Sequence, residues 1–169
     1  IVGAYNAKTA DGEIYIWYGI NGSLLSLNGT EPNVTLVPPD IGLSEEMGRS
    51  ISVGDLNGDG LLDVAAGAPS CDQPSINYGR VHVWYNNGNG IANGSTPNAS
   101  LFFEGAGTGP ELGSKLTIND TNGDGIDDLL ASAPSATVYG NTSAGMVYIY
   151  YGINSTSGIV NGSSPNITL

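Results

Sequence analysis

An acidic nonapeptide occurs twice in this 169-residue chain, with the copies 65 residues apart. Residues 55–63 read Asp-Leu-Asn-Gly-Asp-Gly-Leu-Leu-Asp, and residues 120–128 read Asp-Thr-Asn-Gly-Asp-Gly-Ile-Asp-Asp. Each copy has oxygen-bearing side chains at positions 1, 3, 5 and 9 and glycine at positions 4 and 6. This spacing lets a tight turn gather several oxygens around one hard cation such as Ca²⁺. The repetition also predicts a fold built from repeated units.

Other residues recur at the same spacing and set the phase of the repeat. The clearest pairs are Gly48 with Gly113, Asp55 with Asp120, and Pro69 with Pro134. Residues 1–36 match only the later part of a repeat, without its opening strand and without its acidic loop. We therefore predict a partial unit at 1–36 and whole units at 37–101 and 102–169.

Each whole repeat contains short apolar or alternating segments separated by Gly, Asn, Pro and Ser, which are turn residues. No segment has a sustained helical period, so the chain is predicted to be all-β, with four short antiparallel strands in each whole repeat. The expected strands are 50–53, 61–66, 81–85 and 99–103, with counterparts at 115–118, 126–131 and 147–151.

The two nonapeptides are predicted to be calcium sites. EF-hand and dockerin loops need a carboxylate at position 12 and an adjacent helix, but position 12 is Ala66 or Ala131 and strand-like sequence follows. The ninth residue is therefore the expected last ligand. Mg²⁺ fits less well because its octahedral shell retains several waters. A metal-free polar turn is the alternative, which two copies in register disfavour.

The expected ligands are side-chain oxygens, together with the backbone carbonyl of position 7. Asp127 is expected to point away from the second loop. The first set is Asp55, Asn57, Asp59 and Asp63 with the carbonyl of Leu61, and the second set is Asp120, Asn122, Asp124 and Asp128 with the carbonyl of Ile126.

The composition points to an extracellular protein. The net charge of −12 and only four Lys and Arg residues argue against nucleic-acid binding. The chain has no transmembrane run, and because it starts without Met in mid-repeat we expect a mature or trimmed piece of a longer polypeptide. The single cysteine, Cys71, cannot form a disulfide within the chain.

Ten Asn-x-Ser/Thr sequons favour a glycosylated, secreted or cell-surface protein. Asn119, next to the second acidic loop, is the least expected to be modified. The sequons begin at Asn21, Asn28, Asn33, Asn93, Asn98, Asn119, Asn141, Asn154, Asn161 and Asn166.

The acidic loop, followed by Gly67-Ala68-Pro69 and preceded by Met47-Gly48, resembles the FG-GAP repeat. That repeat builds the β-propeller of integrin alpha subunits and of many bacterial and archaeal surface proteins. The second copy has Leu112-Gly113 and Ser132-Ala133-Pro134, so Phe is replaced in both copies and one Gly is replaced by Ser. The resemblance implies one four-stranded blade per repeat, with calcium in the loop between the first two strands.

A propeller needs four to eight blades to close, so the ring is incomplete within this chain. The chain is either a fragment of a longer propeller or one of several copies that complete a ring, or it stacks end to end. Because the first unit lacks its opening strand, another segment could fill that position by strand addition.

The sequence offers little for catalysis, and we expect no enzymatic activity. His82 alternates with Val81 and Val83 and is expected to face solvent, and neighbouring Glu45 and Glu46 are expected to point to opposite faces. The expected function is a calcium-stabilised adhesion or ligand-binding module that binds a protein or glycan at the cell surface, or further copies of the chain. The alternatives are a subunit of an extracellular filament or surface layer, and a propeller segment of a secreted carbohydrate-active enzyme.

Overall fold

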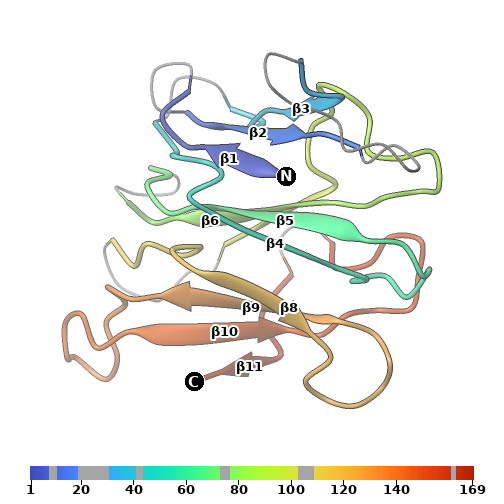
Figure 1. Cartoon of the computed structure of the whole chain (residues 1–169). Coiled ribbons are helices and arrows are strands. Elements are labelled where there is room, and N and C mark those ends of the chain that lie inside the picture. Colours follow the sequence, from blue (N-terminus) through green and yellow to red (C-terminus); the bar gives the residue numbers. More distant parts are fainter. Residues whose placement is uncertain (8–10, 19–30, 41–43, 73–76, 103–108, 161–162) are drawn as a thin grey trace.

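The computed structural model describes residues 1–7, 11–18, 31–40, 44–72, 77–102, 109–160 and 163–169. Its named elements are eleven β-strands in three antiparallel sheets, which are stacked in chain order (Figure 1). Asn21, Asn28, Asn161 and Phe103, which carry predictions made from the sequence, lie outside the described residues. In the described part of the chain, no helix has the length and hydropathy needed to cross a bilayer.

Each whole repeat forms one four-stranded sheet, and strands consecutive in the chain are neighbours in it. The second sheet consists of β4 (Ser50–Gly54), β5 (Asp63–Ala68), β6 (Arg80–Trp84) and β7 (Ala99–Leu101). The third consists of β8 (Leu116–Asn119), β9 (Asp128–Ala133), β10 (Met146–Tyr150) and β11 (Ile167–Thr168). The predicted all-β fold, with four-stranded blades of an incomplete propeller, is therefore confirmed.

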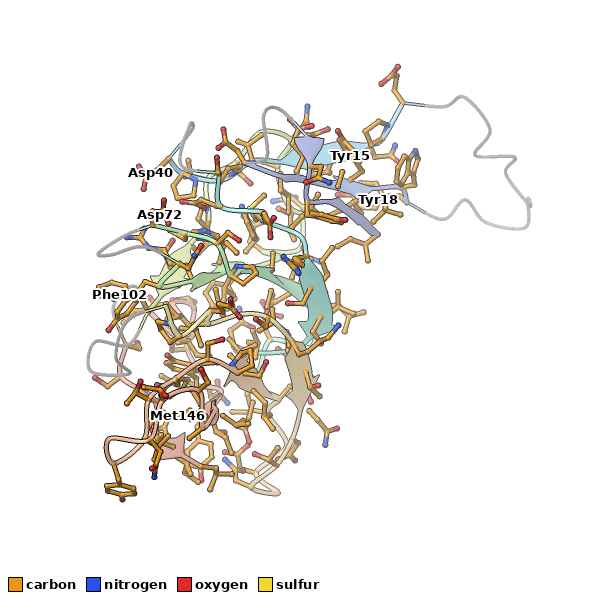
Figure 2. All side chains as sticks on the ribbon, turned by 90° about the vertical axis from the view of Figure 1, so that its left-hand side faces the viewer. Tyr15, Tyr18, Asp40, Asp72, Phe102 and Met146 are labelled. Atoms are coloured by element: carbon orange, nitrogen blue, oxygen red, sulfur yellow. The ribbon has the colours of Figure 1, made fainter. Side chains whose placement is uncertain are left out.

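The first sheet has three strands, β1 (Val2–Ala4), β2 (Glu13–Ile16) and β3 (Val34–Leu36), in the order β1-β2-β3. β1 is equivalent to β5, so the described residues provide no counterpart of β4, as the partial first repeat predicts. Figure 2 shows the same stack from the side, with Tyr15 in the first sheet and Met146 in the third. The boundaries of the three repeat units remain a prediction.

The second strand of each whole repeat begins two residues later than the apolar sequence indicates. Asp63 and Asp128 are the first residues of β5 and β9, whereas Leu61 remains in the loop. The N–H of Leu61 donates to the Asp59 carboxylate at 2.8 Å, and this bond keeps the residue in the turn although its side chain suits a strand.

Two hydrophobic clusters fill the spaces between the three sheets. Alternate residues of β5 point to opposite faces, so Ala65 packs toward the third sheet and Ala66 packs toward the first. The aromatic residues Trp84, Tyr148 and Tyr150 are almost completely buried in these clusters. Because the second sheet is covered on both faces, every residue of β5 is buried.

Backbone contacts between glycines set the spacing of adjacent sheets. A Cβ atom placed on Gly67 would lie 1.9 Å from the carbonyl oxygen of Gly113 in the next repeat. The equivalent pair one sheet earlier is Gly3 and Gly48, where the corresponding distance is 2.0 Å. Neither position admits a side chain, so Gly67-Ala68-Pro69 meets Leu112-Gly113, and Gly3-Ala4 meets Met47-Gly48, through bare backbone.

The position equivalent to Gly67 in the third sheet is Ser132, and its side chain is accommodated within that sheet. The N–H of Lys115 donates to Ser132 Oγ at 3.0 Å. No following sheet covers this position among the described residues. The third sheet can therefore have Ser at this position, where the second sheet requires Gly.

A buried polar network lies between the first and second sheets. His82 is completely buried, with Nε2 3.1 Å from Glu45 Oε2 and Nδ1 2.8 Å from Ser100 Oγ. The Cys71 thiol lies 3.4 Å from the other oxygen of Glu45. The prediction that His82 faces solvent is wrong because both faces of the second sheet are covered. Glu45 and Glu46 do diverge, since Glu46 pairs with Arg49 near the surface.

We predict that Gly67→Ala destabilises the protein by about 2 kcal/mol or more, because the added methyl group collides with the Gly113 carbonyl and separates two sheets. Urea unfolding measures the loss. Ser132→Ala is the matched control at the equivalent position and should cost under about 1 kcal/mol. Equal costs for the two variants would contradict the proposed role of the glycine contact.

We also predict that Glu45→Ala lowers the free energy of unfolding by about 3 kcal/mol, because it leaves buried His82 without its carboxylate partner. Glu46→Ala is the control at the next residue and should cost about 1 kcal/mol or less, as expected for an exposed ion pair. Intrinsic tryptophan fluorescence during urea unfolding measures the free energy of unfolding of both variants. If Glu46→Ala were the more costly change, the buried network would not stabilise the fold as described.

Candidate metal sites

The first acidic nonapeptide forms the turn between β4 and β5, and its carboxylates are bound by the N–H groups of the turn. Asp55 accepts from the N–H groups of Gly58 and Gly60, both at 2.8 Å. Gly58 and Gly60 have φ values of 73° and 84°, a backbone conformation that favours glycine. The turn thereby wraps around the Asp55 carboxylate.

Positions 3, 5 and 9 complete the first set of oxygens. Asn57 and Asp59 are joined by a side-chain bond of 3.1 Å. Asp63 is fully buried and accepts from the N–H of Leu56 at 3.0 Å and from the N–H of Asn86 at 2.9 Å. An ionised carboxylate has about four acceptor positions, so each carboxylate of this loop retains capacity for a further partner.

Burial raises the pKa of Asp63 to about 6. The N–H groups of Asn86 and Leu56 oppose this rise, and the neighbouring carboxylates of Asp59 and Asp55 add to it.

The second nonapeptide repeats this geometry between β8 and β9. Asp120 accepts from Gly123 at 2.7 Å and from Gly125 at 3.0 Å, and these N–H groups lower the pKa of its carboxyl. Asn122 accepts from the N–H of Asp124, and Asp124 accepts from the N–H of Ile126, both at 2.9 Å. The same intraloop bonds therefore shape both turns.

Asp128 closes the second loop in the way that Asp63 closes the first. It is buried, accepts from the N–H and hydroxyl of Thr121 and accepts from the N–H of Gly152 at 3.0 Å. Both ninth-position carboxylates thus connect the loop to the chain that follows the third strand of the sheet. Asn86 and Gly152, which supply these N–H groups, could not be found from the spacing of the nonapeptides.

The two loops differ in what covers them. The first loop packs against the third repeat, where the N–H of Ile153 donates to the Leu56 carbonyl and the N–H of Ser155 donates to the Asn57 carbonyl, both at 3.2 Å. In the second loop, residues 121–125 are exposed. The neighbouring repeat therefore covers part of the first loop, whereas residues 121–125 of the second loop are uncovered.

Asp127 joins the two loops. Its carboxylate accepts from the N–H of Asp55 at 2.9 Å, and its own N–H donates to the Asp55 carbonyl at 3.0 Å. This residue, expected to point away from its own loop, binds the first residue of the other loop. The sequence signal was the difference at position 8, where the first loop has Leu62 and the second has Asp127.

The donor chemistry of both loops suits a hard cation, since every side chain at positions 1, 3, 5 and 9 offers oxygen. The described residues nevertheless contain no group of three His, Cys, Asp or Glu side chains that converge closely enough to hold a metal ion by themselves. The Asn57 and Asn122 oxygens and the position-7 carbonyls would have to complete each set. The assignment of the ten ligands therefore remains a prediction.

Comparison with known proteins identifies the repeats. The FG-GAP repeat model matches residues 47–84 and 113–150. The chain is 37% identical over 127 residues to human phosphatidylinositol-glycan-specific phospholipase D, and this match covers 73% of the chain and 15% of that protein.

Integrin alpha subunits match at a similar level. Integrin alpha-PS5 of Drosophila melanogaster is 36% identical over 112 residues, and integrin alpha-4 of Xenopus laevis is 34% identical over 115 residues. Each match covers 65% of the chain but only 10% of the integrin. The chain is therefore an FG-GAP repeat protein whose repeats are similar to those of integrin alpha subunits.

Proposed function

We propose that this chain is a calcium-stabilised, extracellular FG-GAP module that binds a protein or glycan ligand at the cell surface and has no catalytic activity. The observation that carries the proposal is the pair of oxygen-rich loops, each shaped by its own N–H groups and closed by a buried aspartate. Bound Ca²⁺ would offset the repulsion between the carboxylates and hold the first two strands of each blade together.

The proposed ligands in the first loop are Asp55, Asn57, Asp59, Asp63 and the Leu61 carbonyl, and their counterparts form the second set. The N–H bonds to Asp55 and Asp120 orient those carboxylates without neutralising them. The contacts of Asp127 with Asp55 add support from the neighbouring blade to the first loop. We therefore infer that the first site is the better preorganised of the two.

The sequons support an extracellular location. The sequon asparagines in the described residues are all exposed, as attachment of a glycan requires. They are Asn33, Asn93, Asn98, Asn119, Asn141, Asn154 and Asn166. Similarity to integrin alpha subunits supports a role in adhesion or ligand binding, although the chain spans only 10% of their length.

Assembly by strand addition is a second candidate, favoured by the exposed edge of β1. Among the described strands, β1 pairs with β2 alone, and exposed apolar side chains lie at or near it, including Val2 at 52% and, in the hollow next to Ile1, Leu62 at 63%. A strand from another copy of the chain could pair with this edge and cover these side chains. Particle mass in solution would separate a monomer from a filament.

A segment of a larger secreted enzyme is a third candidate, because several similar proteins are named as phospholipases. The described residues place His82, Glu45 and Ser100 together, but His82 and Glu45 are completely buried. Substrate could not reach this group in the folded chain. This supports a structural role for the network, and any catalytic residues would belong to other parts of such an enzyme.

We predict that calcium raises the thermal midpoint of unfolding and that chelation lowers it. Free calcium at about 100 times its Kd would add about 2.7 kcal/mol per site. Isothermal titration should give two bound ions for the unmodified chain, one for Asp55→Ala or Asp120→Ala, and none for the double variant. Glu31→Ala, which removes an exposed carboxylate outside both loops, should retain both ions. Calcium binding by the double variant would refute the assigned ligands.

We further predict that Asp127→Ala weakens the first calcium site about tenfold, because Asp55 loses a charge-assisted hydrogen bond from the neighbouring blade. The measurement uses Asp120→Ala as background, so that only the first site binds. Leu62→Ala, at the same position of the first loop, is the matched control and should leave the affinity unchanged within about twofold. Equal effects of the two substitutions would exclude specific support by Asp127.

A further inference from the structure

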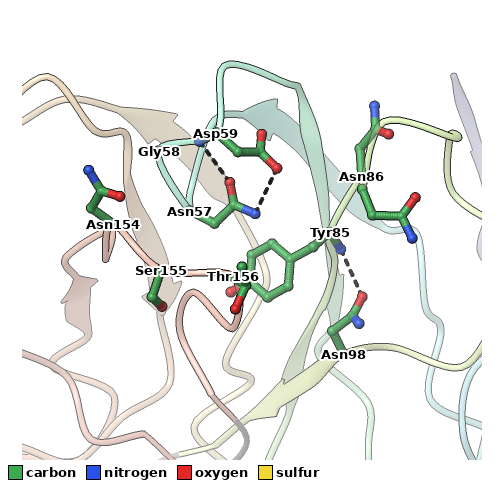
Figure 3. A pocket seen from close by; sticks show the side chains of 10 residues that line it. Asn57, Gly58, Asp59, Tyr85, Asn86, Asn98, Asn154, Ser155 and Thr156 are labelled. Atoms are coloured by element: carbon green, nitrogen blue, oxygen red, sulfur yellow. Dashed lines mark hydrogen bonds between the residues drawn. The ribbon is translucent and has the colours of Figure 1, made fainter.

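A cavity of about 590 Å³ lies where loops of the second repeat meet a loop of the third repeat, and the first acidic loop borders it (Figure 3). Asn57 and Asp59 of the loop form one wall, and residues 154–156 of the third repeat form another. Residues 86–87, which follow β6, contribute a third side. The volume falls within the range typical of pockets for small organic ligands.

The lining is polar but almost uncharged. Side-chain amides come from several asparagines, among them Asn87, Asn98 and Asn154, and hydroxyl groups come from Ser155 and Thr156. Among the described residues of the lining, Asp59 alone has a charged side chain, and it belongs to the proposed calcium ligands. No Lys or Arg is present among the lining residues that the structure describes, so these residues offer no counter-charge for an anion.

Tyr85 supplies an aromatic surface that is held in place, and Figure 3 shows its ring pointing into the cavity. Its hydroxyl donates to the Ile159 carbonyl at 2.8 Å, and its N–H donates to Asn98 Oδ1 at 2.8 Å. Gly158 lies so close to the ring that a Cβ there would be 2.5 Å from its Cζ atom. The ring therefore has little freedom to rotate away.

Comparison of equivalent residues in the three repeats shows which residues of the cavity recur in every sheet and which occur only here. The bond from a tyrosine N–H to an asparagine side chain occurs in every sheet, with Tyr18–Asn33 at 2.7 Å and Tyr151–Asn166 at 2.8 Å. It is therefore part of the fold. The amides at 86 and 87 are not, because the equivalent residues at 152 and 153 are Gly and Ile.

We propose that this cavity binds a neutral carbohydrate. Amide groups both donate and accept, as sugar hydroxyls do, and the ring of Tyr85 offers an apolar face for the C–H groups of a pyranose. The proposal rests on the proposed function in one respect, since the loop that carries Asn57 and Asp59 is the candidate calcium site. It adds a ligand class and a location to the proposed ligand binding.

The sugar has two possible sources with the same chemistry. Asn98 and Asn154 are sequon asparagines in the lining, so a glycan attached to the chain could occupy the cavity. A glycan of another molecule would occupy it if these positions are unmodified. Protein from a host without N-glycosylation and protein from a glycosylating host distinguish these sources.

The test is an NMR titration of the ¹⁵N-labelled, unglycosylated 169-residue chain with calcium present. Glucose, galactose, mannose and N-acetylglucosamine are added separately up to about 50 mM, well above the millimolar Kd expected for a single sugar. We expect one or more of them to shift the side-chain amide signals of Asn87 and Asn154 and the backbone signal of Tyr85. The double variant Asn87→Ala/Asn154→Ala should weaken binding about tenfold or more.

Asn89→Ala is the matched control, because Asn89 is an exposed asparagine on the same loop that does not line the cavity. It should bind sugar within about twofold of the unmodified chain. The absence of shifts at these residues for all four sugars would overturn the proposal, as would equal binding by the double variant when its spectrum shows it folded. Calcium titration of the same samples measures calcium binding by the acidic loops independently of sugar binding. The calcium proposal and the carbohydrate proposal can therefore each fail without the other.

The glycosylated protein then assigns the source. Loss of binding of added sugar relative to the unglycosylated chain would support an attached glycan in the cavity. Unchanged binding would support a glycan from a separate molecule.

Discussion

The architecture depends on how closely successive sheets approach one another through bare backbone. At Gly67 and Gly113, and again at Gly3 and Gly48, a single added Cβ would overlap a carbonyl oxygen of the adjacent sheet. The small residues of β5 allow this approach and remain buried on both faces. The sheet spacing in turn brings the first acidic loop against the third repeat, so the neighbouring blade supports the first candidate metal site.

Much of this arrangement could be predicted because it is encoded at fixed spacing. The recurrence of Asp55 and Gly67 as Asp120 and Ser132 predicts repeated sheets with a turn between the first two strands. The pattern could not predict which neighbours each side chain meets in the folded structure. Alternation predicts that His82 faces solvent, but both faces of its sheet are covered and the residue is buried. Leu61 suits a strand, although the Asp59 carboxylate holds it in the turn.

The loops also acquire partners that local sequence does not reveal. Asp127 binds Asp55 across the sheet interface, and Asn86 donates to Asp63 from the chain after the third strand. These contacts connect the proposed calcium ligands to the neighbouring blade and to the wall of the Asn-lined cavity. In this proposal, a bound ion would stabilise the blades and also position the residues that meet a sugar, so stability and recognition would depend on the same loop.

The central proposal is that each acidic nonapeptide holds one Ca²⁺ between the first two strands of its blade. A crystal structure of the chain grown with calcium, with anomalous scattering used to locate the ions, tests this most directly. The proposal predicts one anomalous peak in loop 55–63 and one in loop 120–128, each surrounded by the oxygens of positions 1, 3, 5, 7 and 9 at about 2.3–2.6 Å. Well-ordered loops without such peaks would contradict it.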